Sequence, residues 1–222
     1  MQITTLNTDL SKRVVINSEQ LPWVKSPSPG VLRRPLERFG AESGRATSIV
    51  KYEPNSTFPS HTHPEGEEIL VLEGTFSDEH GDYPNGTYIL NPQGFEHAPR
   101  TREGCLIFVK LCQYRGKDRP RIVVDTGALE WQPGPAPGIR IKHLYSQTGY
   151  PETVVLMKLD AGATFGPERY SRGAEALILD GSALDGQNHC PKGTWIRIPP
   201  GDVFALSSPE GCTVYLKTNG LF

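Results

Sequence analysis

The chain contains the same pattern twice. Residues 51–110 align with residues 158–217 at a constant offset of 107 without a gap, and 20 of the 60 aligned pairs are identical. Upstream the offset becomes 108, where VVIN at residues 14–17 matches IVVD at residues 122–125. Repeats of this length are structural units that fold alike. The 222 residues are therefore predicted to form two homologous modules.

The boundary between the modules falls in the polar stretch YRGKDRP, residues 114–120, because the second copy begins directly after it. We predict a first module over residues 1–117 and a second over residues 118–222. Shared glycines such as Gly74 and Gly181 end apolar runs at places where the chain must turn.

Short apolar runs indicate the fold class. The 23 glycines and 20 prolines are dispersed between segments such as EEILVLEG, CLIFVKL and ETVVLMKL, which are rich in Val, Ile and aromatic residues. No segment repeats apolar residues at the spacing of a helix. The sequence is therefore predicted to be all-β, as a barrel or a sandwich.

The charge balance bears on partners. Lys and Arg total 23 and Asp and Glu total 25, which gives a net charge of −2 without a long block of either sign. We therefore expect no nucleic-acid partner and no membrane partner. The first twenty residues lack the apolar stretch of a secretory signal, and no window reaches the roughly 18 apolar residues of a membrane helix. A cytoplasmic location is predicted.

Histidines are clustered in FPSHTHPEGEE, residues 58–68. In an extended strand His61 and His63 point to the same face, so both imidazoles can bind one ion. A carboxylate, Glu67 or Glu68, follows a turn, and His97 follows the PQG turn. Three imidazoles and one carboxylate suit Zn, Fe(II), Mn or Ni and leave coordination positions open. The alternative is that these are surface histidines in polar turns.

The second copy distinguishes these alternatives. At the offset of 107 the candidate ligands are all replaced together: His61 by Glu168, His63 by Tyr170, Glu67 by Ala174 and His97 by Phe204. Glu68, in contrast, remains as Glu175. Residues that are lost as a set while their scaffold persists behave like one site. The predicted ligands are His61, His63, Glu67 and His97, holding one divalent transition metal per chain.

Two motifs carry a family resemblance. HTHPEGEEILVLEG has the form HxH(x)3E(x)6G, and GTYILNPQGFEH has the form G(x)5PxG(x)2H. Both resemble the motifs of the cupin superfamily, although Thr101 stands where that family has Asn. The resemblance implies two tandem jelly-roll barrels, a bicupin, with the metal bound by the same four residues. The second module would be a degenerate cupin without metal ligands.

Residues of roughly 50 to 110 resemble more narrowly the cupin-like domain of ChrR, an anti-sigma factor. In that family a separate helical zinc domain binds the sigma factor. Here no His or Cys precedes His61, so the resemblance does not extend to that domain.

Two functions follow as expectations. The first is a metal-dependent enzyme of dioxygenase type acting on a small oxygen-bearing organic compound. The second is a non-catalytic sensor in which metal and ligand occupancy alter contact with a partner. Either function implies a small-molecule ligand or substrate, and edge strands make a homodimer a reasonable expectation.

Several other residues near the predicted site have both a functional and a simpler structural interpretation. Arg33, Arg34, Arg38 and Arg45 could approach an acidic substrate, but a solvated strand edge is the preferred interpretation. Phe95 has Asp202 as its counterpart and is the favoured pocket aromatic. Glu96 could support the neighbouring His97 by a hydrogen bond, although an exposed turn carboxylate is slightly preferred.

Overall fold

The computed structural model describes residues 5–41 and 44–222, and in this part of the chain the regular structure is antiparallel strands with one short 3-10 helix, η1 (Ser18–Gln20). The predicted all-β class is confirmed. The chain divides into two compact units. Of the described residues, the first unit contains 5–8, 21–41 and 44–128, and the second contains Asp9–Gln20 and Leu129–Phe222. No helix in the described residues is long and apolar enough to cross a bilayer.

The first unit is built on a sheet with the strand order β1-β4-β5-β11-β7-β9-β12, to which β3 and β8 add at the sides, and on a separate β6/β10 pair. Its strands are β1 (Thr5–Leu6), β3 (Val24–Lys25), β4 (Val31–Phe39), β5 (Ala46–Tyr52), β6 (His61–His63), β7 (Glu67–Asp78), β8 (Gly81–Pro84), β9 (Thr87–Asn91), β10 (Phe95–His97), β11 (Cys105–Leu111) and β12 (Ile122–Asp125).

The second unit repeats this plan with the order β13-β14-β15-β21-β17-β19-β2, and β16, β18 and β20 join off this path. Its strands are β2 (Val14–Asn17), β13 (Gln132–Pro133), β14 (Ile139–Tyr145), β15 (Thr153–Leu159), β16 (Ala163–Arg169), β17 (Ala174–Asp185), β18 (Asn188–Pro191), β19 (Thr194–Ile198), β20 (Val203–Ser208) and β21 (Cys212–Thr218).

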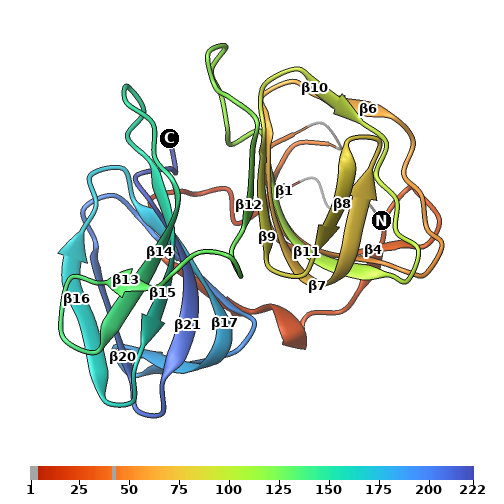
Figure 1. Ribbon diagram of the computed structural model, residues 1–222. Helices are drawn as coiled ribbons and strands as arrows, with labels where there is room; N and C mark the ends of the chain where they lie inside the picture. Colours follow the sequence, from red (N-terminus) through yellow and green to blue (C-terminus); the bar gives the residue numbers. More distant parts are fainter. Residues whose placement is uncertain (1–4, 42–43) are drawn as a thin grey trace. The chain divides into compact units, whose positions relative to one another are not determined.

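Each unit takes one strand from the opposite half of the sequence. β12 pairs with β9 in the first unit, where Figure 1 shows the green strand beside a yellow one, and β2 pairs with β19 in the second. These are the equivalent segments VVIN and IVVD. The predicted modules, residues 1–117 and 118–222, describe the repeat along the sequence. The compact units differ from them because residues 9–20 and 118–128 lie in the other unit.

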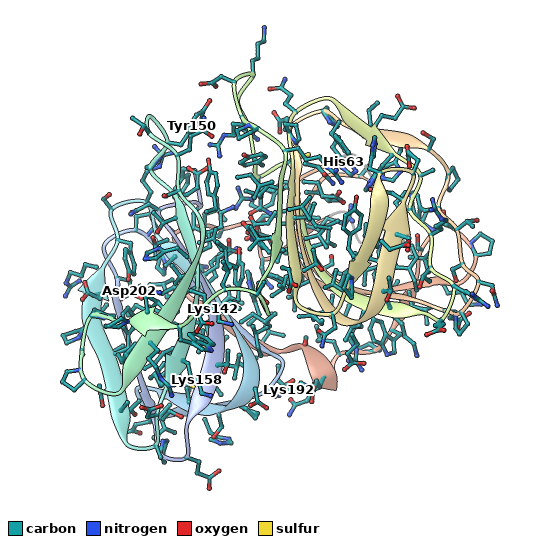
Figure 2. All side chains as sticks on the ribbon, in the orientation of Figure 1. His63, Lys142, Tyr150, Lys158, Lys192 and Asp202 are labelled. Carbon is teal, nitrogen blue, oxygen red and sulfur yellow. The ribbon has the colours of Figure 1, made fainter. Side chains whose placement is uncertain are left out.

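The core of the first unit is formed by alternating residues of three neighbouring strands. One face of β5, β7 and β11 supplies apolar side chains that are almost completely buried, as the period of two in a strand requires. These are Val50, Tyr52, Ile69, Val71, Ile107 and Val109. Side chains fill the space between the ribbons in both units (Figure 2).

Two bulges change which residues face this interior. In β7 the register with β11 shifts between Val71 and Glu73, so Leu72 is the extra residue. In β4 the register with β5 shifts between Pro35 and Glu37, so Leu36 is the extra residue. A bulge moves every later side chain of its strand to the opposite face.

The prediction that Gly74 ends a strand at a turn is wrong, because Gly74 lies within β7, two residues after the first bulge, and Gly181 lies within β17. A substitution tests whether this position requires glycine. Its φ is +70°, and an added Cβ would lie 2.1 Å from the carbonyl oxygen of Gly104. Gly94 has a similar φ of +81° with nothing within 4 Å of such a Cβ. We expect Gly74→Ala to lower the free energy of unfolding by on the order of 3 kcal/mol and Gly94→Ala by about 1 kcal/mol. Urea unfolding followed by circular dichroism measures both, and equal losses would contradict the steric explanation.

Candidate metal centre

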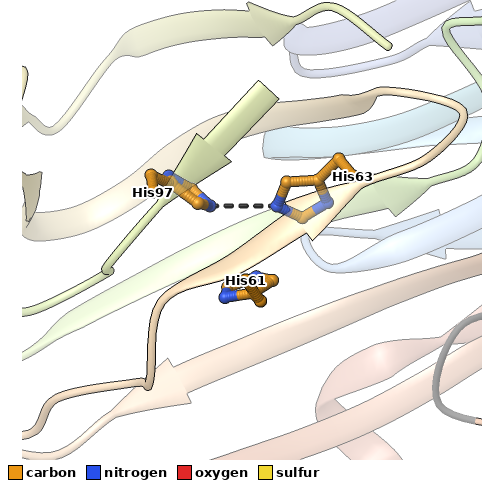
Figure 3. A group of neighbouring side chains, drawn as sticks. All are labelled: His61, His63 and His97. Carbon is orange, nitrogen blue, oxygen red and sulfur yellow. Dashed lines mark hydrogen bonds between the residues drawn. The ribbon is translucent and has the colours of Figure 1, made fainter. Parts of the chain in front are cut away.

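The pairing of two short strands brings the predicted histidines together. β6 pairs with β10 so that His97 lies opposite His61 and Phe95 lies opposite His63. His61 and His63 project from the same side of β6, as the period of two predicts, toward His97 (Figure 3). The second unit has the same register, with Phe204 opposite Glu168. The offset of 107 found in the sequence is thus also the structural equivalence.

The ligand-type atoms converge on one point. The Nε2 atoms of His63 and His97 are 3.0 Å apart, and Oε2 of Glu67 lies 3.4 Å from the first and 3.5 Å from the second. The ligand atoms of all three histidines lie within 4.8 Å of one another. Two atoms that each sit about 2.1 Å from one ion, at an angle between 90° and 110°, are about 3.0–3.4 Å apart. The spacing of the His63, His97 and Glu67 atoms therefore fits a shared ion, and His61 lies beside these three residues.

Neighbouring groups set the tautomers of two of the histidines. Nδ1 of His61 lies 2.8 Å from the carbonyl oxygen of Pro59, which only accepts, so Nδ1 carries the proton and Nε2 keeps the lone pair. Nδ1 of His97 lies 3.2 Å from Oδ2 of Asp78, which has the same effect. A metal-ligating histidine is commonly oriented in this way. Sequence analysis considered Glu96 for this role, but Glu96 is exposed and accepts from Ser60 instead.

The pKa values of the cluster are shifted in different directions. Burial lowers the pKa of His63, and the neighbouring histidines add to this effect. Burial also opposes a charge on His97, but the hydrogen bond to Asp78 and the charge of Glu67 raise its pKa above the usual 6.5. For Glu67, burial is outweighed by His63, His97 and the amide of Asn91, so its pKa is lowered. The carboxylate is ionised and available as a ligand at neutral pH.

The structure places Glu67 with the histidines and Glu68 elsewhere. Glu67 is 5% exposed and touches the cluster, whereas the carboxylate of Glu68 accepts from the hydroxyl of Tyr88 at 2.8 Å. Glu68 lies opposite Lys110 in the β7/β11 ladder, and the second unit keeps both as Glu175 and Lys217. Glu68 therefore belongs to the shared scaffold. That His61, His63, Glu67 and His97 bind a metal stays a prediction.

A second layer of polar side chains surrounds the cluster. Asn91 donates to Oε2 of Glu67 at 3.0 Å, and Arg121 donates to Asn91 at 3.1 Å and to the hydroxyl of Tyr83 at 2.6 Å. Tyr83 donates in turn to Asp78 at 2.9 Å, which closes the path back to His97. Sequence analysis missed this layer. The distance from Glu67 to Asp78 would put them on opposite faces of a regular strand, and only the bulge at Leu72 turns both inward.

A cavity of 290 Å³ opens beside the cluster and is bordered by His61, His63 and Glu67. Most of its wall is apolar and comes from the inner faces of β5 and β11 together with Phe58 and Phe76. The prediction that Phe95 lines the pocket is wrong. Phe95 is absent from the cavity wall and stacks instead against His97, at 5.7 Å between ring centroids, and under the guanidinium of Arg121. A pocket of this size and polarity suits a small organic molecule.

The second unit has filled the equivalent space with apolar residues. Phe204, which replaces His97, is completely buried and packs edge-on against Phe165 at 5.8 Å. Ala174 replaces Glu67 and belongs to the same core cluster, and Tyr170, which replaces His63, packs against it. Three of the four ligand positions in the second unit are therefore part of a hydrophobic core or pack against it, whereas Glu168, which replaces His61, is exposed.

Barrels of antiparallel strands are the fold of the cupin class, and two of them in one chain make a bicupin, here with the histidine cluster in the first barrel. Both halves of the chain match the profile of the ChrR Cupin-like domain, over residues 11–115 and 119–221, and the chain belongs to this family. The resemblance and the bicupin architecture predicted from sequence are confirmed. No relative was found among curated proteins at the level of sequence.

Solved structures share the fold at low sequence identity. A candidate dioxygenase of Nostoc punctiforme has a TM-score of 0.77 at 16% identity, covering 95% of this chain and 84% of its own. The pirin YhhW of Escherichia coli in complex with nickel(II) has a TM-score of 0.70 at 11% identity, covering 95% of this chain and 100% of its own. Salicylate 1,2-dioxygenase of Pseudaminobacter salicylatoxidans has a TM-score of 0.65 at 12% identity, covering 96% of this chain and 85% of its own.

A pair of adjacent isosteric substitutions tests the ligand set. Glu67→Gln removes the charge beside His63 and His97, whereas Glu68→Gln changes a residue hydrogen-bonded to Tyr88. We expect Glu67→Gln to weaken metal binding at least roughly 10-fold and Glu68→Gln to leave about one metal per chain. Elemental analysis after equilibrium dialysis measures both. Equal loss in the two variants would refute the assignment of Glu67.

The opposite pKa shifts of His63 and His97 give a pH prediction. As the pH of metal-free protein falls, His97 should take up its proton first, above pH 6.5, and His63 later, below that value. Protons compete with metal for the same nitrogens, so metal affinity should fall as pH falls, beginning with protonation of His97. NMR titration of the imidazoles measures the order. Asp78→Asn should lower the pKa of His97, and titration of His63 above His97 would contradict the electrostatic account.

Proposed function

We propose that the first unit binds one divalent transition metal through His61, His63, Glu67 and His97 and uses it to oxidise a small oxygen-bearing organic compound with dioxygen. The observation that carries this proposal is the cluster of His61, His63 and His97, with Glu67 beside His63 and His97, next to a largely apolar cavity. A purely structural zinc site is usually closed and cysteine-rich. This cluster contains no cysteine and borders a space large enough for a substrate.

The residues of the cluster would have different roles in binding the metal and a ligand. His63 and His97 are held with their Nε2 atoms together, and Glu67 is kept ionised by their proximity and by Asn91. When bound, the metal would supply Lewis acidity and, as Fe(II), the ability to activate dioxygen. His61 is half-buried at the cavity wall, so a ligand that enters the cavity would reach the cluster beside His61.

Fold likeness to a candidate dioxygenase and to salicylate 1,2-dioxygenase supports this class of chemistry without indicating a substrate. The family match to the ChrR Cupin-like domain favours a second candidate, a metal-dependent sensor that binds a ligand without turnover. The expectations of a cytoplasmic location, of no nucleic-acid or membrane partner and of a homodimer are compatible with both candidates.

Metal analysis and oxygen uptake separate the candidates. Protein purified without an affinity tag should contain about one metal per chain, and the His61→Ala/His97→Ala double variant none, because it lacks two of the ligands. Anaerobic loading with Fe(II) followed by oxygen-electrode measurement against small carbonyl and phenolic compounds should show uptake that the double variant lacks. Tightly bound zinc without uptake would favour the sensor, and no metal in the wild type would overturn both candidates.

A further inference from the structure

The cavity beside the cluster has a cationic wall. Arg33 and Arg38, both on β4, border the same cavity as His61, His63 and Glu67. Arg38 is only 4% exposed, and its guanidinium donates to the carbonyl oxygen of Ala41 at 2.8 Å, which fixes the group in place. Guanidinium groups at an otherwise apolar wall are well suited to bind carboxylate.

The bulge in β4 is what places both arginines at this wall. Arg33 pairs with Val50 and Arg38 pairs with Ala46, and both partners border the cavity. The two arginines are an odd number of residues apart and would face opposite sides of a regular strand. The extra residue Leu36 restores Arg38 to the inner face. Bulges frequently re-aim side chains next to functional sites.

Arg34, between the cavity-facing residues of β4, has a structural role. Arg34 does not border the cavity and lies over the ring of Trp23 at 4.1 Å. The second unit keeps this arrangement, with Lys142 over the ring of Trp131 at 4.7 Å. The cation on this face is therefore part of the scaffold in both units.

The cavity-facing polar residues behave differently in the second unit. The registers of β4 with β5 and of β14 with β15 make Ile141 the counterpart of Arg33 and Leu159 the counterpart of Tyr52. Both replacements are part of, or pack against, the hydrophobic core of the second unit. Arg33 and Tyr52 are thus lost together with the four candidate metal ligands, as residues of one site would be.

The charges of the lining residues favour an anion. Glu67 is the only carboxylate among the described residues that border the cavity, and it contacts His63 and His97. Among the described residues that border the cavity, the two guanidinium groups outnumber this single carboxylate. Tyr52 adds a hydroxyl donor, because burial and the charge of Glu67 raise its pKa and keep it protonated.

We propose that the ligand of this cavity is a small organic monocarboxylate whose carboxylate is bound by the guanidinium of Arg33, with Arg38 beside it, and whose apolar body contacts the inner faces of β5 and β11. This inference rests on the proposed function, since it names the class of compound that would be presented to the metal. A 290 Å³ cavity limits the compound to a small molecule.

Matched ligands and matched variants test this assignment. Calorimetric titrations of the Ni(II)-loaded full chain would use benzoate, phenylacetate and hexanoate, each beside its neutral amide. Arg33→Gln is compared with Arg34→Gln, which makes the same chemical change one residue along, on the other face of the strand. We expect at least one carboxylate to bind more tightly than its amide. Arg33→Gln should weaken that binding roughly 10- to 100-fold, and Arg34→Gln should leave it unchanged.

Three results would overturn the inference: no carboxylate binding more tightly than its amide, equal losses in Arg33→Gln and Arg34→Gln, or a carboxylate preference that persists undiminished in Arg33→Gln. The last would mean that the metal alone selects the anion. Metal content is measured on every sample. One metal per chain without an effect of Arg33 leaves the proposed metal centre intact, whereas absence of metal from the wild type overturns the proposed function itself.

Discussion

Each unit is completed by an edge strand from the opposite half of the sequence, and this strand exchange supplies part of the polar network around the histidine cluster. β12 extends the first unit beside β9, and β2 extends the second beside β19. Each of these segments is preceded by an arginine, and the two arginines occupy equivalent positions in the repeats. Arg13 binds Asp185 through Nε at 3.1 Å, and Arg121 lies near Asp78 while it donates to Tyr83 and Asn91. The layer that holds Glu67 and His97 is therefore completed from the second repeat.

Bulges are the second device that builds the site. A strand with a strict period of two cannot turn both Glu67 and Asp78 inward, nor both Arg33 and Arg38. One extra residue, Leu72 in β7 and Leu36 in β4, resolves each conflict. The result is a buried cluster with a carboxylate on each side of His97 and a cavity wall with two guanidinium groups.

The two units show how one fold supports different interiors. Both keep the buried Glu and Lys that face each other across the ladder, and both keep a cation stacked on a tryptophan. They differ where the first unit has His63, His97, Glu67, Arg33 and Tyr52 and the second has residues that form its core or pack against it, and where His61 is replaced by the exposed Glu168. Buried polar groups are costly unless they are paired, so a unit without a ligand to bind gains stability by replacing them. This contrast supports treating the replaced residues as one functional set.

The repeat, the all-β class and the cupin family could be read from the sequence, and Glu67 rather than Glu68 could be predicted as the ligand, because these follow from spacing, from turn residues and from comparison of the two copies. The sequence also led to the predictions that Phe95 lines the pocket and that Arg33 and Arg38 lie on a solvent-exposed strand edge. Only the tertiary structure decided that Phe95 packs behind His97, that Asp78 orients His97, and that both arginines border the cavity. The physical reason is that bulges and strand exchange depend on pairing between segments far apart in the chain. Local periodicity does not contain that information.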